Sequence, residues 1–429
     1  MLRNLFLHFR PTTIPEPTLR FTLSWGLGGM AAVLVMLQFA TGILLKFVYE
    51  PVPVSAYASI LILQNEVPFG KLIRNLHYWG ANLLVLTVFL HFLRVFFTGA
   101  FRPPRQVNWI VGLGLFALVL SANLTGYLLP WDQLAYWAVT ICTGMLAYIP
   151  GIGAGLLAII RPGDEIGPAA LKLFFTCHTA LIPAVFVGLM AFHFWRVRRG
   201  GGLVNPQSSA ADIHADVSRV PTVPCLIVRE AAVGLALIAG VMLLAVFFDA
   251  PLEGPANPGL SPNPTKAPWY FAGVQELMLH FHPLIAVVVI PVSGVLALAL
   301  LPWISPGQTA SGVWFISKNG RRTAGMAAAV AIIVIPILVF LDETLMKGSG
   351  RLLSFPPVAG VIIFCLTIVG LTGWFYLLRK RMATTESETV QAVFTLLFVS
   401  FAVLTIIDIW FRGASMALTW PWNGFSPRP

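Results

Sequence analysis

The sequence predicts an all-α polytopic membrane protein, with an N-terminal four-helix bundle followed by a C-terminal multi-helix module. Its 429 residues are 57% hydrophobic and only 10% charged, whereas soluble domains carry about 25% charged residues. The mean hydropathy is +0.83. Apolar segments of the roughly 20 residues that a helix needs to cross a bilayer recur along the whole chain. We therefore expect about nine transmembrane helices.

These nine segments share a length near that minimum and few charges within them. They are 25–48, 72–97, 108–129, 169–195, 226–248, 270–302, 323–341, 357–378 and 389–411. The segment 270–302 is unusually long and contains Pro283 and Pro291, and we expect it to bend at one of them.

The net charge of +10 does not indicate nucleic-acid binding, because the basic residues cluster between apolar spans. Alternating the spans places four basic clusters on one side of the membrane. They are Arg102/Arg105, Arg196/Arg198/Arg199, Lys318/Arg321/Arg322 and Arg379/Lys380/Arg381. The positive-inside rule makes that side the cytoplasm and places the N-terminus there too.

Four histidines are arranged in two matched pairs. His77 and His91 lie 14 residues apart in the second span, and His178 and His193 lie 15 apart in the fourth. Fourteen residues make nearly four turns, about 21 Å, so both rings of a span share one face. The two spans run in the same direction, which sets His77 level with His178 and His91 level with His193. A lone intramembrane histidine is more often a hydrogen-bonding residue, but two facing pairs predict two bis-histidine haems b with these four metal ligands.

Glycines repeat with the same step in the first and third spans. The pairs are Gly28 with Gly42 and Gly112 with Gly126, each 14 residues apart. Small residues commonly serve helix packing, but the matched step favours a second use, in which a flat macrocycle lies against bare backbone. Arg74 and Arg94 flank the second span, where they could pair haem propionates or snorkel at a helix end.

Two aromatic, irregular segments fall on the outer side, at 126–153 and 261–271. Together they predict a pocket for a flat apolar ligand. The polar segment 200–224 is the natural boundary between modules. We therefore divide the chain into a di-haem bundle at 1–205, a second module at 206–345, and two added helices with a tail at 346–429.

With these histidine and glycine pairs, the GYLLPW segment at 126–131 and the turn at Pro268–Tyr270, the chain resembles the cytochrome b subunits of quinol–cytochrome c reductases. The resemblance covers about residues 20–345. The histidine steps and the PWDQ segment at 130–133 are similar to the b/f branch. The resemblance implies a fused cytochrome b6–subunit IV-like chain of prokaryotic type in the bacterial cytoplasmic membrane.

The resemblance implies an enzyme subunit of a bc-type complex. It would oxidise quinol at an outer site, pass electrons through the outer haem of His77/His178 and the inner haem of His91/His193, and reduce quinone at an inner site while protons are translocated. The expected partners are a Rieske iron–sulfur protein, a cytochrome c-type subunit, quinone, membrane lipid and a second copy of the complex. Arg198 matches the inner site. The outer site would contain Pro130, Trp131, Tyr136, Ala138, Pro268, Trp269 and the catalytic Tyr270.

The sequence departs from the family pattern in three places. Pro268 stands where the PEWY turn has its proton-accepting glutamate. Gly26 stands where the b/f branch carries a cysteine for an extra inner haem, so we expect no covalent haem c on this chain. Nine spans also exceed the usual eight. His8, His214, His280 and His282 lack the paired arrangement and are left out of the metal set.

Glu276 is the candidate to replace the missing acid, with His280 four residues on to take the proton further. An ionisable group inside a span is costly and is by default a functional candidate. We expect burial to raise the pKa of Glu276. The alternative is a helix-start residue favoured by the helix dipole.

Another class of protein also uses two b haems, namely the membrane anchor subunit of a dehydrogenase or hydrogenase. A histidine-bearing transporter is a further alternative. Neither needs paired outer segments or a five-span second module, and an anchor would lack a Rieske partner. The sequence therefore favours the bc-type interpretation.

Overall fold

The computed structural model describes residues 11–163, 165–205, 217–304, 312–346 and 357–420. The chain forms two compact units that are discontinuous in sequence. The first unit comprises residues 1–135, 167–255 and 301–314, and the second comprises residues 136–166, 256–300 and 315–429. Among the described residues the named strands are β1 (Thr13–Pro15) and β2 (Arg219–Pro221), which pair antiparallel in the first unit.

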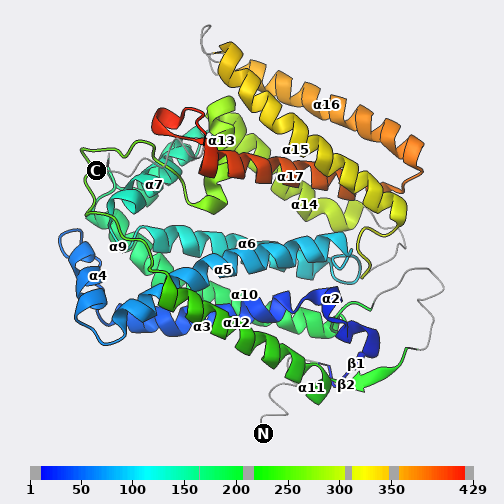
Figure 1. Cartoon of the computed structure of the whole chain (residues 1–429), viewed down its shortest axis with the longest axis horizontal. Coiled ribbons are helices and arrows are strands. Elements are labelled where there is room, and N and C mark those ends of the chain that lie inside the picture. Colours follow the sequence, from blue (N-terminus) through cyan, green and yellow to red (C-terminus); the bar gives the residue numbers. More distant parts are fainter. Residues whose placement is uncertain (1–10, 164, 206–216, 305–311, 347–356, 421–429) are drawn as a thin grey trace. The chain divides into compact units, whose positions relative to one another are not determined.

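The first unit is built around α5, which contacts α3, α4, α6 and α12, while α6 packs on α10 (Figure 1). The spans α3, α5, α6 and α9–α10 supply the predicted N-terminal bundle. The helices of this unit are α2 (Phe21–Ser24), α3 (Leu27–Lys46), α4 (Ala56–Asn65), α5 (Gly70–Phe97), α6 (Gln106–Tyr127), α9 (Pro168–Thr176), a π-helical turn (Cys177–Leu181), α10 (Ile182–Arg199), α11 (Thr222–Cys225) and α12 (Ile227–Phe247).

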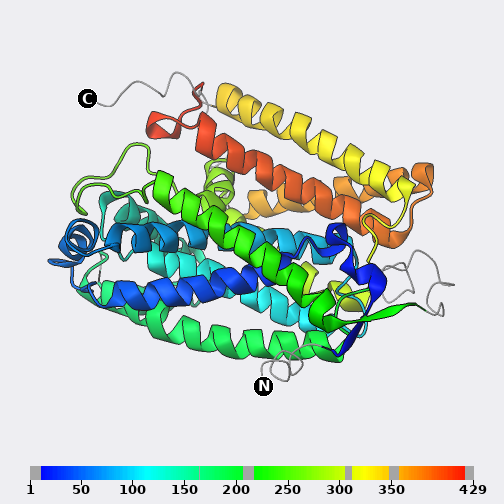
Figure 2. The same cartoon turned by 60° about the horizontal axis from the view of Figure 1, so that its bottom comes forward.

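In the second unit α17 packs along α15 and against α13. Figure 2 shows α15 in yellow beside α17 in red. Alanines at their contact, Ala327 and Ala331 of α15 and Ala392 of α17, let the two backbones approach closely. The helices are α7 (Gln133–Gly144, which begins in the first unit), η2 (Met145–Tyr148), α8 (Gly153–Ile160), α13 (Trp269–His280), the π-helical η5 (Leu284–Val289), α14 (Ile290–Ile304, which ends in the first unit), α15 (Lys318–Met346), α16 (Pro357–Met382), α17 (Glu386–Phe411) and η7 (Ala414–Met416).

The membrane-spanning class predicted from composition is confirmed. In the described part of the chain, eight helices are long and apolar enough to cross a bilayer, and α16, with 26 residues, occupies the eighth predicted segment. The prediction of one bent helix over 270–302 was wrong. Helix α13 ends at His280, Phe281 is extended, and the spanning helix starts at Leu284. Pro283 supplies no backbone N–H and disfavours helix in the residue before it, so the helix breaks there.

Side chains tie helix ends together as alternating spans require. In the first unit, Arg105 Nη2 donates to the Gly200 carbonyl over 2.8 Å, which brings the start of α6 to the end of α10. In the second unit, Asn319 Nδ2 donates to the Met382 carbonyl over 3.2 Å, which joins the start of α15 to the end of α16. Each tie therefore gathers two of the predicted basic clusters at one end of its unit.

The start of α17 carries a capping box. Thr385 Oγ1 accepts from the Glu388 amide, and Glu388 Oε2 accepts from the Thr385 amide over 2.8 Å. Replacing Thr385 by Ala removes the cap and should destabilise the protein by about 1 kcal/mol, measured as a lower thermal-unfolding temperature in detergent. Thr385→Ser keeps the oxygen and should match the wild type. Equal unfolding temperatures for the Ala and Ser variants would contradict the role of the cap.

Candidate functional sites

A π-helical turn reconciles the unequal histidine steps. His178 lies in the turn Cys177–Leu181, between α9 and α10. A π turn inserts one extra residue into a helix. The 15-residue step from His178 to His193 therefore returns to the face that a 14-residue step reaches in α5, where His77 and His91 lie.

His77 and His178 face each other in the first unit, with ring centroids 6.1 Å apart. Metal–imidazole bonds are about 2 Å long, so two rings at this separation leave room for one metal ion between them. His77 and His178 would therefore hold such an ion together.

Hydrogen bonds fix how these two rings are presented. His77 Nδ1 lies 2.9 Å from Thr41 Oγ1, and that hydroxyl donates to the Leu37 carbonyl over 2.7 Å. His178 Nδ1 lies 3.0 Å from the Ala122 carbonyl, which can only accept. Nδ1 therefore carries the proton in each ring, and the Nε2 lone pair is left for a metal.

His91 and His193 line one cavity of about 210 Å³ in the first unit. Aromatic side chains such as Phe92 and Phe116 form part of its wall, together with the guanidinium of Arg94. Arg94 Nε donates to the Leu23 carbonyl over 2.9 Å, but its Nη2 is buried without a partner among the described residues. A carboxylate entering this cavity would satisfy that donor, so the lining fits a haem with its propionates.

The four predicted glycines lie against the four imidazoles. A Cβ at each would fall 3.2 Å (Gly28), 3.3 Å (Gly42), 3.8 Å (Gly112) and 2.6 Å (Gly126) from Cε1 of His91, His77, His193 and His178, respectively. At Gly126 a side chain would displace the ring. Bare backbone therefore limits the position of the His178 ring most, and those of His91 and His77 less, while the contact at Gly112 has ordinary van der Waals length.

The two predicted arginine partners are placed differently. Arg94 reaches the cavity of His91 and His193. Arg74 is buried and bonded elsewhere: its Nη1 donates to Gln64 Oε1 and the Ala250 carbonyl, both over 2.8 Å, and its Nη2 donates to the Pro251 carbonyl over 2.6 Å. Arg198, the residue predicted for the inner quinone site, is exposed in the last turn of α10. His8 and His214 lie outside the described residues.

The predicted outer-site residues fall in both units. Pro130 and Trp131 belong to the first unit, where Trp131 has a φ of +53° and is buried. In the second unit, Tyr136 and Ala138 of α7 are buried, while Pro268 immediately precedes α13, whose first residues are Trp269 and Tyr270.

An open cavity of about 510 Å³ in the second unit brings the two predicted outer segments together. Ile141 of α7 and the segment 261–265 line it, with Gln275, Met278 and Leu279 of α13. Gln275 also holds the turn, because its Oε1 accepts from the Ala267 amide and its Nε2 donates to the Thr265 carbonyl. The proposed outer-site residues of this unit are not among its described lining residues; they are Tyr136, Ala138, Pro268, Trp269 and Tyr270.

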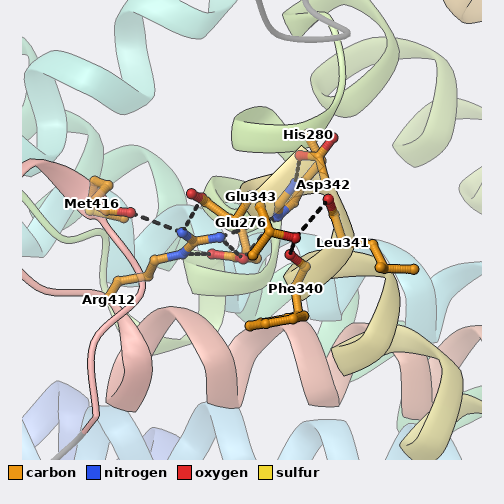
Figure 3. A network of polar contacts seen from close by, with 9 residues as sticks. Glu276, His280, Phe340, Leu341, Asp342, Glu343, Arg412 and Met416 are labelled. Atoms are coloured by element: carbon orange, nitrogen blue, oxygen red, sulfur yellow. Dashed lines mark hydrogen bonds and ion pairs between the residues drawn. The ribbon is translucent and has the colours of Figure 1, made fainter. Parts of the chain in front are cut away.

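A buried charge network joins α13, α15 and the end of α17 (Figure 3). Arg412 Nε donates to Glu276 Oε2 over 2.9 Å, and its Nη2 donates to Glu276 Oε1. Both side chains are fully buried. Arg412 Nη1 binds Glu343. His280 bridges two acids, with Nε2 3.0 Å from Glu276 Oε1 and Nδ1 2.6 Å from Asp342 Oδ2.

These contacts overturn the expectation of a raised pKa at Glu276. Burial alone would raise the pKa of its carboxyl group, but hydrogen bonds from His280 and Arg412 outweigh burial and lower it. Burial would likewise lower the pKa of His280, yet its bonds to Glu276 and Asp342 raise it. Glu276 is therefore a weak proton acceptor, and His280 is a stronger base than an ordinary histidine.

Sequence reasoning missed Arg412, Asp342 and Glu343, because they lie far along the chain from Glu276. A signal was present in the ninth span, where Asp408 is fully buried with neither carboxylate oxygen bonded within the described chain. A carboxyl group in such a segment is expensive and points to nearby polar partners. Arg412, one turn further on, is such a partner for Glu276.

Replacing Arg412 by Met should destabilise the protein by about 3–5 kcal/mol, because it leaves Glu276 charged and unpaired in the interior. The thermal-unfolding temperature of the detergent-solubilised protein measures the loss. Arg379→Met removes an exposed pair with Glu386 and should cost less than about 1 kcal/mol. An Arg412 variant no less stable than the Arg379 variant would argue against a buried ion pair.

Comparison with known proteins places these sites in a family. The family model described as cytochrome b/b6/petB matches residues 14–201. Cytochrome b6 of Synechococcus elongatus is 42% identical over 175 residues, covering 41% of this chain and 81% of that protein. Cytochrome b6 of Heliobacterium modesticaldum is 39% identical over 187 residues, covering 44% of this chain and 88% of that protein.

A solved structure named "Hyperthermophilic respiratory Complex III" contains a chain of the same fold. It superimposes with a TM-score of 0.68 at 23% identity, over 95% of this chain and 96% of the other. The fold likeness thus extends well beyond the residues matched in sequence. On the sequence relatives, whose length is largely covered, this chain belongs to the cytochrome b/b6 family, as a cytochrome b subunit of the quinol–cytochrome c reductase type.

Proposed function

We propose that this chain is the di-haem cytochrome b subunit of a bc-type complex, which oxidises quinol at an outer site and reduces quinone at an inner site with proton translocation. The observation that carries the proposal is the matched set of two imidazole pairs, each with glycine backbone against its rings. Family membership and the two levels of histidines support the same activity.

Two pairs of histidines in the first unit would each hold one haem b. His77 with His178 would hold the outer group, and His91 with His193 the inner one. Thr41 and the Ala122 carbonyl orient the outer ligands through Nδ1. Arg94 would bind a propionate in the inner cavity. When bound, haem b supplies one-electron transfer chemistry.

The quinone sites are proposed from the same framework. At the outer site we propose the residues Pro130, Trp131, Tyr136, Ala138, Pro268, Trp269 and Tyr270, with the cavity beside α13 as the entry for an apolar ring. At the inner site we propose Arg198. The proton-accepting role expected of Glu276 is not proposed, because Arg412 holds that carboxylate in its charged form.

The assembly proposed for the chain follows from its family and from its basic helix ends. We propose a bacterial cytoplasmic membrane, a cytoplasmic N-terminus, a Rieske iron–sulfur protein, a cytochrome c-type subunit and a dimeric complex. The ties between basic helix ends support the orientation. We also propose the modules 1–205, 206–345 and 346–429 as the functional divisions of the chain.

The haem proposal is tested by changing the glycine nearest a ligand. Gly126→Ala places a Cβ 2.6 Å from Cε1 of His178, which should displace the ring and reduce the haem b content from two to one per chain. A pyridine haemochrome assay measures the content, and His178→Ala should give the same value. Gly240→Ala is the matched control, because Gly240 is exposed on α12, does not line the cavity, and no neighbouring atom lies within 4 Å of its added carbon. One haem b per wild-type chain would refute the proposal.

The absence of a thiol at Gly26 predicts that both haems leave the chain on denaturation. Haem staining of a denaturing gel should therefore show no band at the 46.7 kDa of this chain. A cytochrome c-type subunit from the same preparation provides the positive control. A stained band at the mass of this chain would show a covalent attachment.

Purification distinguishes the bc-type complex from a di-haem anchor. The complex isolated in mild detergent should contain an iron–sulfur subunit of Rieske type and should oxidise quinol when a cytochrome acceptor is added. Isolation with a dehydrogenase or hydrogenase subunit instead would favour the anchor.

A further inference from the structure

We propose that His280 takes up a proton released by quinol oxidation and that Asp342 passes it outward, with Glu276 and Arg412 as positioning residues. The inference rests on the proposed function, because it needs a quinol as the proton donor. This route would carry the proton that the family's glutamate usually accepts, since Pro268 occupies the position of that glutamate in this chain.

The three linked side chains form a gradient of exposure. Glu276 is 0% exposed, His280 is 11% exposed and Asp342 is 26% exposed. The links are short, at 3.0 Å from Glu276 to His280 and 2.6 Å from His280 to Asp342. A histidine between two carboxylates therefore connects a fully buried acid to a partly exposed one at the end of α15 (Figure 3).

The position of Glu276 and His280 beside the open cavity also supports the proposed proton route. Helix α13 presents Gln275, Met278 and Leu279 to the cavity and presents Glu276 and His280 to α15 and to Arg412. Met416 lines the cavity and its carbonyl accepts from Arg412 Nη1 over 2.9 Å. The charge network thus lies directly behind one wall of the cavity.

Charged groups from each neighbouring element determine which member of the network exchanges protons. His280 faces Glu276 on its own helix, Asp342 on α15, and Arg412 after α17, whose Nη2 lies 3.3 Å from Nε2. Glu343 forms an ion pair with Arg412. Asp408 lies four residues before Arg412 in the chain. Arg412 holds two hydrogen bonds on Glu276, so the carboxylate stays ionised and keeps the ring in place. The ring is the group left to gain and lose a proton.

The proposed cycle conserves protons. The imidazolium gives its Nδ1 proton to the Asp342 carboxylate, which releases it to solvent. The neutral ring keeps its Nε2 proton on Glu276, and the protonated Asp342, which is the more exposed of the two side chains, turns outward and leaves Nδ1 open. Nδ1 then takes one of the two protons of a quinol in the cavity, relayed by water, as the quinol gives its two electrons to the one-electron acceptors of the complex and its second proton to solvent. The ionised Asp342 returns to the recharged ring.

The test uses the purified complex with decylubiquinol and menadiol as quinols, and compares His280→Gln and Asp342→Asn with wild type. His280→Gln should slow quinol oxidation at least tenfold, with both b haems and the unfolding temperature retained. Free imidazole should partly restore a His280→Gly variant. In Asp342→Asn, loss of the negative charge lowers the affinity of the ring for its proton, so the acid limb of the rate profile should move down by about one pH unit.

Control variants separate this role from a structural one. Glu386→Gln changes an exposed acid of the same unit, and His282→Gln changes the neighbouring histidine; neither should alter the pH profile. A loss of rate that only follows loss of stability, with no pH shift and no imidazole rescue, would overturn the carrier role. A wild-type complex that oxidises neither decylubiquinol nor menadiol would instead refute the proposed function itself.

Discussion

The close approach of helix backbone to imidazole is the constraint on which the first unit depends. At four positions in α3 and α6 a glycine takes the place that a side chain would occupy against a histidine ring. Because α3 and α6 each contribute two such contacts, the spacing of the glycines and the spacing of the histidines must agree along the whole bundle. The helices are therefore matched at two levels at once, and neither level can shift without the other.

That matching explains why so much of the first unit could be predicted from sequence. Helical periodicity is a local property, so steps of 14 residues already place His77 and His91, or Gly28 and Gly42, on shared faces. The exception was the step of 15 to His193. Periodicity alone could not show whether His193 lies on a different helix face from His178 or whether the helix contains an extra residue. The structure contains a π-helical turn at His178, which accommodates that extra residue.

The second unit was less predictable because its main interactions are distant in sequence. Pro283 indicated an interruption, but the sequence did not show that α13 ends before it. Glu276 was identified as costly to bury, yet its partner Arg412 lies 136 residues further on. Burial alone predicts a raised pKa for Glu276; with His280 and Arg412 both bonded to its carboxylate, the direction reverses. Local patterns thus locate unusual residues, while the sign of their electrostatics depends on contacts that only the fold reveals.

The length of chain between Glu276 and Arg412 also matters for biogenesis. At about 5–20 residues per second, the ribosome needs on the order of 10 s to make the 136 residues between them. During that interval α13 must remain outside its final packing, protonated or in contact with water, since an unpaired carboxylate is not tolerated in an apolar interior. Insertion of α17 is therefore the event that allows the second unit to close, which makes its assembly late and cooperative.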